Sequence, residues 1–109
     1  MKLDSKYVFH VPLYKYEDNR LTPLEIDDIL CELFDEFHKK GFEGMYVSKV
    51  KSRYKGRIYD ELLITLFTTE DKSPEEIFER WFLKNNEMLK QDEFAYEKGN
   101  AMTIVRLVL

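Results

Sequence analysis

MYVSKVKSRYKGRIYDELLITLFT, residues 45–68, is typical of two β-strands joined by a tight turn. Lys55-Gly56 supplies the turn, because glycine tolerates the positive φ that tight hairpins need. The run Leu62-Leu63-Ile64-Thr65-Leu66-Phe67 is apolar at almost every position, so both faces of this strand have to be covered. The stretch therefore predicts a hairpin of residues 45–54 and 57–68, whose second strand lies in the centre of a sheet.

A helix is predicted on each side of this hairpin. Each begins with a Ser/Thr-Pro-x-Glu sequence, which is the signature of a capping box with proline at the first helical position. The first starts at Thr22-Pro23-Leu24-Glu25 and ends before Gly41, and the second starts at Ser73-Pro74-Glu75-Glu76 and fades near residues 90–92. Apolar residues follow both starts at helical spacing.

The remaining segments predict strands at the two ends of the chain. Aromatic and β-branched residues at 7–14 are typical of a strand that ends near Pro12, and a polar loop is expected at residues 15–20. A short strand at 94–97, a turn at 98–100 and a final strand at 101–109 follow the second helix. The order β-α-β, β-α-β predicts one α+β domain over residues 1–109, ferredoxin-like, with an antiparallel sheet of four or five strands and both helices on one face.

Composition limits the class of protein. The chain has 109 residues, of which 44% are hydrophobic and 15% aromatic, too many for a disordered chain. It contains no apolar run long enough to span a membrane, its first residues lack the apolar core of a signal peptide, and its single cysteine, Cys31, has no internal disulfide partner. These features predict a cytoplasmic protein with no membrane partner.

Signals for catalysis are weak. General acid–base chemistry by either histidine, His10 or His38, needs a positioned partner, which the sequence does not identify. Cysteine and histidine never occur at zinc-ligand spacing, and no glycine-rich phosphate loop is present. We predict no catalytic residue, metal or cofactor. The acid pair Asp60-Glu61 interrupts a strand, and ion pairing with the cationic strand beside it is the expected reason.

Positive charge is concentrated in the hairpin. The chain has 17 basic and 21 acidic residues, a net charge of −4, yet cations occupy every second position from Lys49 to Arg57. A period of two predicts one cationic face of a strand, which would bind phosphates while tyrosines stack on bases. The alternative is that the cations protect an edge strand from aggregation. The candidate nucleic-acid or polyanion site consists of Lys49, Lys51, Arg53, Tyr54, Lys55, Arg57 and Tyr59.

The strands that are apolar on both faces suggest a further role. Helices cover one face of the sheet only, so Leu63, Phe67 and their neighbours would form an exposed apolar patch on the other. The favoured prediction is a non-enzymatic interaction domain that forms a homodimer through this open sheet face. Alternatives are a nucleic-acid-binding module using the basic hairpin, and an enzyme or small-ligand carrier with a pocket at the sheet interface. Candidate lining residues for that pocket are His10, Tyr14 and Arg106.

Overall fold

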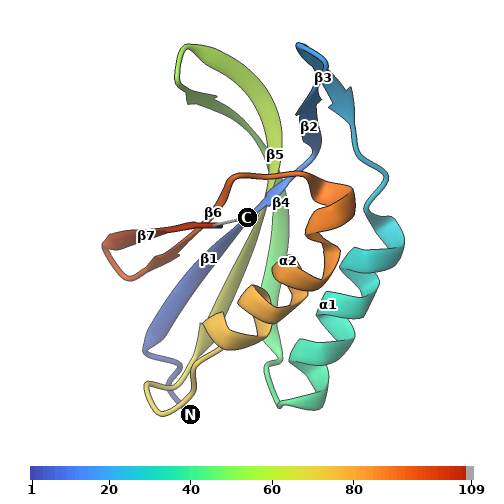
Figure 1. Cartoon of the computed structure of the whole chain (residues 1–109). Coiled ribbons are helices and arrows are strands. Elements are labelled where there is room, and N and C mark those ends of the chain that lie inside the picture. Colours follow the sequence, from blue (N-terminus) through green and yellow to red (C-terminus); the bar gives the residue numbers. More distant parts are fainter. Residues whose placement is uncertain (108–109) are drawn as a thin grey trace.

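The computed structural model describes residues 1–107 and has an α+β fold. A five-stranded antiparallel sheet with strand order β4-β5-β1-β6-β7 is covered on one face by two helices (Figure 1). This confirms the predicted α+β architecture. The elements are β1 (Ser5–Pro12), β2 (Tyr14–Glu17), β3 (Arg20–Pro23), α1 (Asp27–Lys39), β4 (Gly44–Tyr54), β5 (Arg57–Thr68), α2 (Glu75–Leu89), β6 (Glu93–Lys98) and β7 (Ala101–Arg106).

The predicted hairpin of residues 45–54 and 57–68 is confirmed. Strand β4 pairs with β5 along its whole length and lies at one edge of the sheet. Lys55 and Gly56 both have positive φ, as a two-residue hairpin turn requires. Strand β5 lies between β4 and β1, so it is an inner strand of the sheet, and Figure 1 shows the hairpin curving away beyond the ends of the helices.

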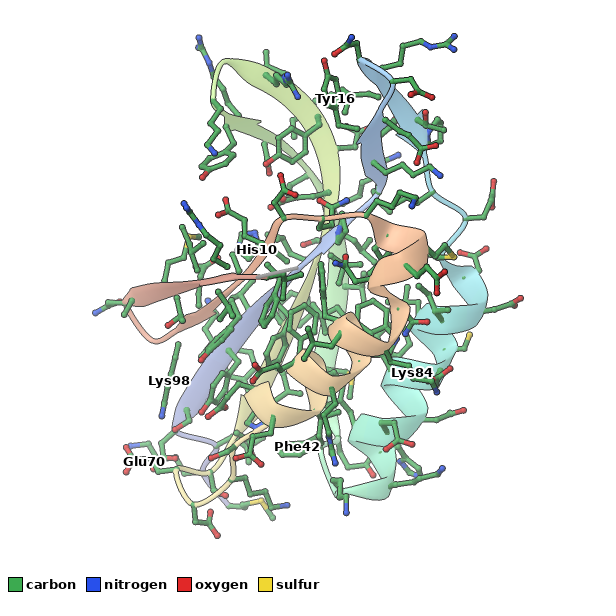
Figure 2. The ribbon with its side chains drawn as sticks, in the orientation of Figure 1. His10, Tyr16, Phe42, Glu70, Lys84 and Lys98 are labelled. Atoms are coloured by element: carbon green, nitrogen blue, oxygen red, sulfur yellow. The ribbon has the colours of Figure 1, made fainter. Side chains whose placement is uncertain are left out.

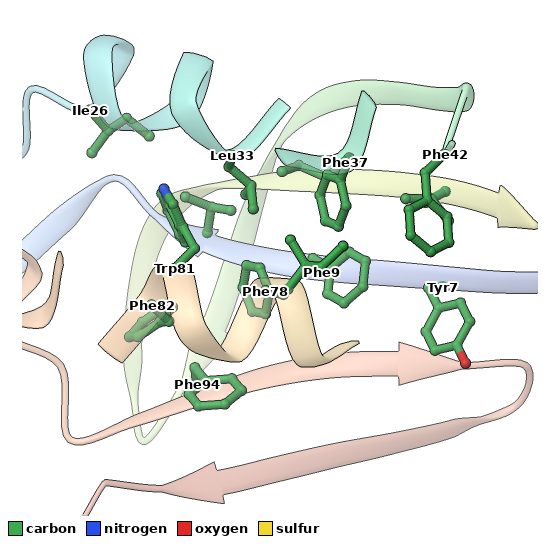
Figure 3. Close-up of a cluster of buried hydrophobic side chains, with 14 of the residues drawn as sticks. Tyr7, Phe9, Ile26, Leu33, Phe37, Phe42, Phe78, Trp81, Phe82 and Phe94 are labelled. Atoms are coloured by element: carbon green, nitrogen blue, oxygen red, sulfur yellow. The ribbon is translucent and has the colours of Figure 1, made fainter. Parts of the chain in front are cut away.

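The core lies between the sheet and the helices. Strand β1 contributes three alternate buried residues to the core, Tyr7, Phe9 and Val11. Phe78 of α2 lies over Phe9, with the two ring centroids 4.7 Å apart (Figure 3). Trp81 donates its indole N–H to the backbone carbonyl of Ile29 at 2.6 Å, which ties α2 to α1. The large aromatic side chains therefore fix how both helices sit on the sheet.

The predicted loop at residues 15–20 is wrong, because this segment belongs to a second hairpin. Strands β2 and β3 pair antiparallel around Asp18 and Asn19, both of which have positive φ. Aspartate and asparagine tolerate this conformation better than other residues with a side chain. The predicted start of the first helix at Thr22-Pro23 is also wrong: these residues end β3, and α1 begins at Asp27.

The C-terminal part agrees with the predicted elements. Helix α2 begins at Glu75 and ends at Leu89, where Lys90 adopts the left-handed conformation. Strands β6 and β7 form the predicted hairpin at the edge opposite β4. The last two residues of the predicted final strand, Val108 and Leu109, lie outside the described residues. Within residues 1–107, neither helix has the length and apolar character needed to cross a membrane.

Candidate functional site

The candidate site lies on the open face, by which we mean the face of the sheet opposite the helices. Side chains of a strand alternate between faces, and cross-strand neighbours share a face. Because Phe9 points to the core, His10 points to the open face, together with Leu63, its partner on β5. On β6, Glu97 is opposite Val8 and shares this face.

A histidine held between two carboxylates forms the centre of this face. The Nδ1 atom of His10 lies 2.6 Å from Oε1 of Glu61, and its Nε2 atom lies 2.7 Å from Oε2 of Glu97 (Figure 2 labels His10). A carboxylate only accepts hydrogen bonds, so both ring nitrogens must donate, and His10 is an imidazolium in this arrangement. The cluster joins side chains of three neighbouring strands, β5, β1 and β6, which also pair through their backbones.

The two carboxylates differ in their access to solvent. The side chain of Glu61 is 11% exposed, whereas that of Glu97 is 35% exposed; His10 lies between them at 18%. Glu61 is therefore the buried partner of Nδ1, and Glu97 is the partner of Nε2 that is more accessible to solvent. Among residues 1–107, no group of three His, Cys, Asp or Glu side chains is arranged to hold a metal ion.

The environment changes the acidity of His10. Partial burial lowers its pKa, but hydrogen bonds to Glu61 and Glu97, together with their negative charges, outweigh burial and raise the pKa above its ordinary value. The protonated form is thus favoured in the folded chain.

This raised pKa predicts how stability depends on pH. A group whose pKa is higher in the folded than in the unfolded chain adds stability below its unfolded pKa, and this stability is lost as pH rises through the folded value. We expect the free energy of unfolding of the wild type to exceed that of His10→Gln most clearly below about pH 6.5 and the difference to shrink at higher pH. Urea unfolding across this range tests it, and a constant difference would contradict the proposed ion pairing.

Tyrosines extend the polar cluster toward the long hairpin. The hydroxyl of Tyr54 donates to Oε1 of Glu93 at 2.8 Å, so the end of β4 reaches across to β6. Burial, followed by the negative charge of Glu61 and the neighbouring groups Tyr54 and Glu93, raises the pKa of Tyr59. Histidine, glutamate and tyrosine side chains of β1, β4, β5 and β6 therefore share the open face.

The predicted cationic face of the hairpin is only partly correct. Tyr54 is opposite Arg57, whereas Lys51 is opposite Asp60 and Arg53 is opposite Ile58. Cross-strand partners share a face, and the odd-numbered residues of β4 lie opposite the even-numbered residues of β5. Lys51 and Arg53 therefore lie on one face and Arg57 on the other. A period of two continues along a strand but not through a two-residue turn, so the prediction that all five cations share a face is wrong.

Most of the hairpin cations already have partners in the chain. Asp60 accepts a hydrogen bond from Nζ of Lys51 at 2.8 Å, and its other carboxylate oxygen lies 3.7 Å from Nζ of Lys49. These contacts confirm the cross-strand ion pairing expected for this aspartate. The guanidinium of Arg57 lies 3.9 Å from the ring centroid of Tyr16, which joins the long hairpin to the β2–β3 hairpin (Figure 2 labels Tyr16). Lys55 lies 5.2 Å from the ring centroid of Tyr54.

Of the three predicted pocket residues, only His10 belongs to the cluster. Among residues 1–107, no hydrogen bond or ion pair links it to Tyr14 or Arg106. The backbone carbonyl of Tyr14 on β2 accepts a hydrogen bond from Gln91 at 3.0 Å. Arg106 lines a separate cavity of about 750 Å³ between α2 and the end of β7. By register Arg106 is opposite Glu93 and shares the open face, but no hydrogen bond or ion pair among residues 1–107 joins the three predicted side chains in one pocket.

The sequence analysis did not identify Glu93 and Glu97 as members of the cluster, and it assigned the wrong partner to Glu61. Glu97 and Glu93 were not singled out, and Glu61 was expected to pair with the cationic strand, yet it contacts His10. Glu61 lies 51 residues and Glu97 87 residues from His10 in the sequence. The interruption of an apolar strand by Glu61 was a detectable signal, but only the strand register identifies its partner.

Comparison with protein-family models found no match, and comparison with curated proteins found none either. Among solved structures, the chain is similar to a phage SAM lyase in complex with S-methyl-5'-thioadenosine. The TM-score is 0.57 and the sequence identity 13%, and the match covers 94% of this chain and 89% of that one. At this identity the likeness concerns the fold alone.

Proposed function

We propose that the open face binds a small ligand next to His10 and that this site has the make-up of an acid–base catalytic centre. The observation that carries the proposal is the double contact of His10, with Nδ1 on Glu61 and Nε2 on Glu97. Partly buried histidines with carboxylate partners and a shifted pKa are concentrated at functional sites. This extends the sequence-based alternative of an enzyme or small-ligand carrier.

The unequal exposure of the two glutamates suggests how such a site works. A ligand that displaces Glu97 from Nε2 leaves the buried His10–Glu61 pair intact. In that state Glu61 orients the imidazole through Nδ1, and Nε2 faces the ligand to give or take a proton. The carboxylate of Glu97, once released, accepts hydrogen bonds from ligand hydroxyl groups.

The structural neighbour suggests the first ligands to try. That enzyme is a phage SAM lyase in complex with S-methyl-5'-thioadenosine. This nucleoside has two ribose hydroxyls, which can donate hydrogen bonds to a carboxylate such as that of Glu97. Tyrosine rings such as Tyr54 and Tyr59 are suitable partners for a purine base or a cation. We therefore propose an adenosine-containing small molecule as the ligand class.

Calorimetric titration with SAM and with S-methyl-5'-thioadenosine tests this function. We expect the wild type to bind at least one of them and His10→Gln and Glu97→Gln to bind it about tenfold or more weakly, in line with the loss of one charge-assisted hydrogen bond. His38→Gln is the matched control, because His38 is exposed and pairs only with Glu43 among the described residues. Failure of the wild type to bind either compound, or equal binding by His10→Gln, would contradict the proposal.

A second proposal concerns the assembly predicted from the sequence, a homodimer through the open face. Tyr46 on β4 and Met102 and Ile104 on β7 are each more than half exposed. By register all three share the open face with His10. Apolar side chains at both outer strands support a partner that covers this face. Light scattering tests the homodimer, and a monomer at high micromolar concentration would contradict it. The cytoplasmic location predicted from the sequence stays a prediction.

Nucleic-acid binding by the hairpin also stays a prediction, which salt dependence can test. The logarithm of the affinity for duplex DNA falls with the logarithm of salt concentration by about 0.9 per neutralised phosphate. Since three of the five cations already contact Asp60 or Tyr16, we expect a slope no steeper than about −2 if the wild type binds at all. Fluorescence polarisation measures this salt dependence. A slope near −4.5, together with loss of binding when Lys51, Arg53 and Lys55 are changed to Glu, would instead support a site formed by all five cations.

A further inference from the structure

The two outer strands of the sheet differ in how their edges are protected. Edge strands of soluble proteins usually carry charged residues, proline or a bulge, which prevent pairing with another chain. Strand β4 has three exposed cations, Lys49, Lys51 and Arg53. Residues 101–105 of β7 contain no charge or proline, pair with β6 without a bulge, and are exposed at the first four positions. The edge formed by β7 is therefore the one that can accept another strand (Figure 1).

The backbone of β7 directs hydrogen-bonding groups away from the sheet. Leu107 donates its N–H to the carbonyl of Asp92 at 2.8 Å, in the register of the β6–β7 pair. Alternate residues of an antiparallel strand bond to the same neighbour, so Thr103 also bonds to β6. The N–H and C=O groups of Met102 and Ile104 point to the opposite side, where no strand lies among the described residues.

The helical layer stops short of β7. Leu83 of α2 is 54% exposed and lines, together with Val105, the cavity of about 750 Å³ between α2 and the end of β7. Thr103 is on the helix side of the sheet, because it is opposite Tyr96, which is opposite the buried Phe9. It is nevertheless exposed. A strand can therefore be added beside β7 without meeting α2.

We propose that β7 pairs antiparallel with β7 of a second copy, which joins the two five-stranded sheets into one. Identical antiparallel strands are related by a two-fold axis perpendicular to the sheet, so the helices of both copies lie on the same side. This contact goes beyond the proposed ligand site and the homodimer through the open face. It uses the edge of the sheet and leaves the side chains around His10 uncovered, and a chain that makes both contacts forms a tetramer.

The side chains of β7 favour one register of this pair. With Thr103 opposite its own copy, Met102 is opposite Ile104 of the second copy, and these two residues exchange both backbone hydrogen bonds. Pairs of threonines and pairs of apolar residues stabilise neighbouring strands. Arg106 is opposite Asn100, so no like charges face each other. Centring the pair on Ile104 would instead place Arg106 opposite Met102.

Cysteine cross-linking tests the pairing and its register. In a Cys31→Ser background, Thr103→Cys should form a disulfide between two copies when treated with oxidised glutathione. Directly opposite residues of a non-hydrogen-bonded pair have Cα atoms about 4.5 Å apart, which a disulfide can span. Ala101→Cys is the matched control, because it is exposed on the same face of β7 but is opposite Val105 of the second copy. No cross-link at position 103, or equal cross-linking of both variants, would overturn the pairing.

Charge variants test the same contact without a disulfide. In sedimentation velocity, Thr103→Lys and Thr103→Glu should each weaken the dimer about tenfold or more, because like charges would be directly opposite. Mixing the two variants should restore a dimer with one copy of each. Thr22→Lys makes the same change on β3, outside this edge, and should leave the dimer intact.

The outcomes separate the edge contact from the homodimer through the open face. A wild-type dimer that Thr103→Lys leaves intact would overturn the edge contact and keep the contact through the open face, since Thr103 is on the helix side. A monomeric wild type would overturn both, while calorimetric titration still decides the ligand site. Near-ultraviolet circular dichroism checks that each variant is folded, so that loss of the dimer is not confused with unfolding.

Discussion

Replacing Phe78 with alanine is expected to lower the free energy of unfolding by about 3–5 kcal/mol, the range for removing a buried aromatic side chain. The ring of Phe78 is fully buried at the junction of α2 with the sheet. It lies 4.7 Å from Phe9 and 5.7 Å from Phe94, centroid to centroid. Neighbouring aromatic rings are too large to collapse into the space left behind. Urea unfolding followed by tryptophan fluorescence measures the effect, since Trp81 packs on Phe78 at 5.8 Å.

The matched control for this prediction is on the same helix. Leu83 is 54% exposed, so Leu83→Ala removes a large apolar side chain with little loss of burial. We expect a change within about 0.5 kcal/mol, as for most surface substitutions. A loss below about 1 kcal/mol for Phe78→Ala would mean that α2 does not pack on the sheet through this residue.

The sequence predicted the elements whose hydrophobic pattern is regular. The run from Leu62 to Phe67 is apolar on both faces, and β5 is indeed an inner strand whose alternate residues face the helices or the open face. Aromatic residues at helical spacing likewise located α2. In both cases burial reinforces local propensity, so the local pattern and the tertiary structure agree.

The start of α1 could not be predicted in the same way. Thr22-Pro23 has the local signature of a helix start, but Thr22 pairs with Lys15 in the β2–β3 hairpin. The competing signal was Asp18-Asn19, a pair that suits the positive φ of a hairpin turn. Pairing with a neighbouring strand overrides the preference of a four-residue motif, and the helix begins four residues after Pro23.

The candidate site was hidden because it depends on register. The pairing of β1 with β5 determines whether His10 lies close to Glu61. A slip of one residue in this pairing would move the side chain to the other face of the sheet. The same reasoning explains the error about Arg57: the turn at Lys55-Gly56 sets which residues oppose each other. Composition and periodicity do not contain this information.

Breaking the pair between His10 and Glu61 is the second large effect that we expect. His10→Leu leaves the buried Glu61 carboxylate without its cation and facing Glu97 across the space of the imidazole. The expected loss is about 2–3 kcal/mol, between that of a charge-assisted hydrogen bond and that of a broken buried ion pair. Urea unfolding near pH 6, where the raised pKa keeps His10 protonated, measures it.

A double-mutant cycle shows whether the loss comes from the pair. Glu61→Leu should cost less than His10→Leu, because Glu97 still accepts from His10 when Glu61 is absent. In His10→Leu/Glu61→Leu no buried carboxylate is left unpaired at position 61, so the combined loss should be smaller than the sum of the single losses by about 1 kcal/mol or more. Additive losses would mean that the two side chains do not interact. The coupling matters for function, because a His10–Glu61 pair that is stable without Glu97 is the state in which Nε2 is free to meet a ligand.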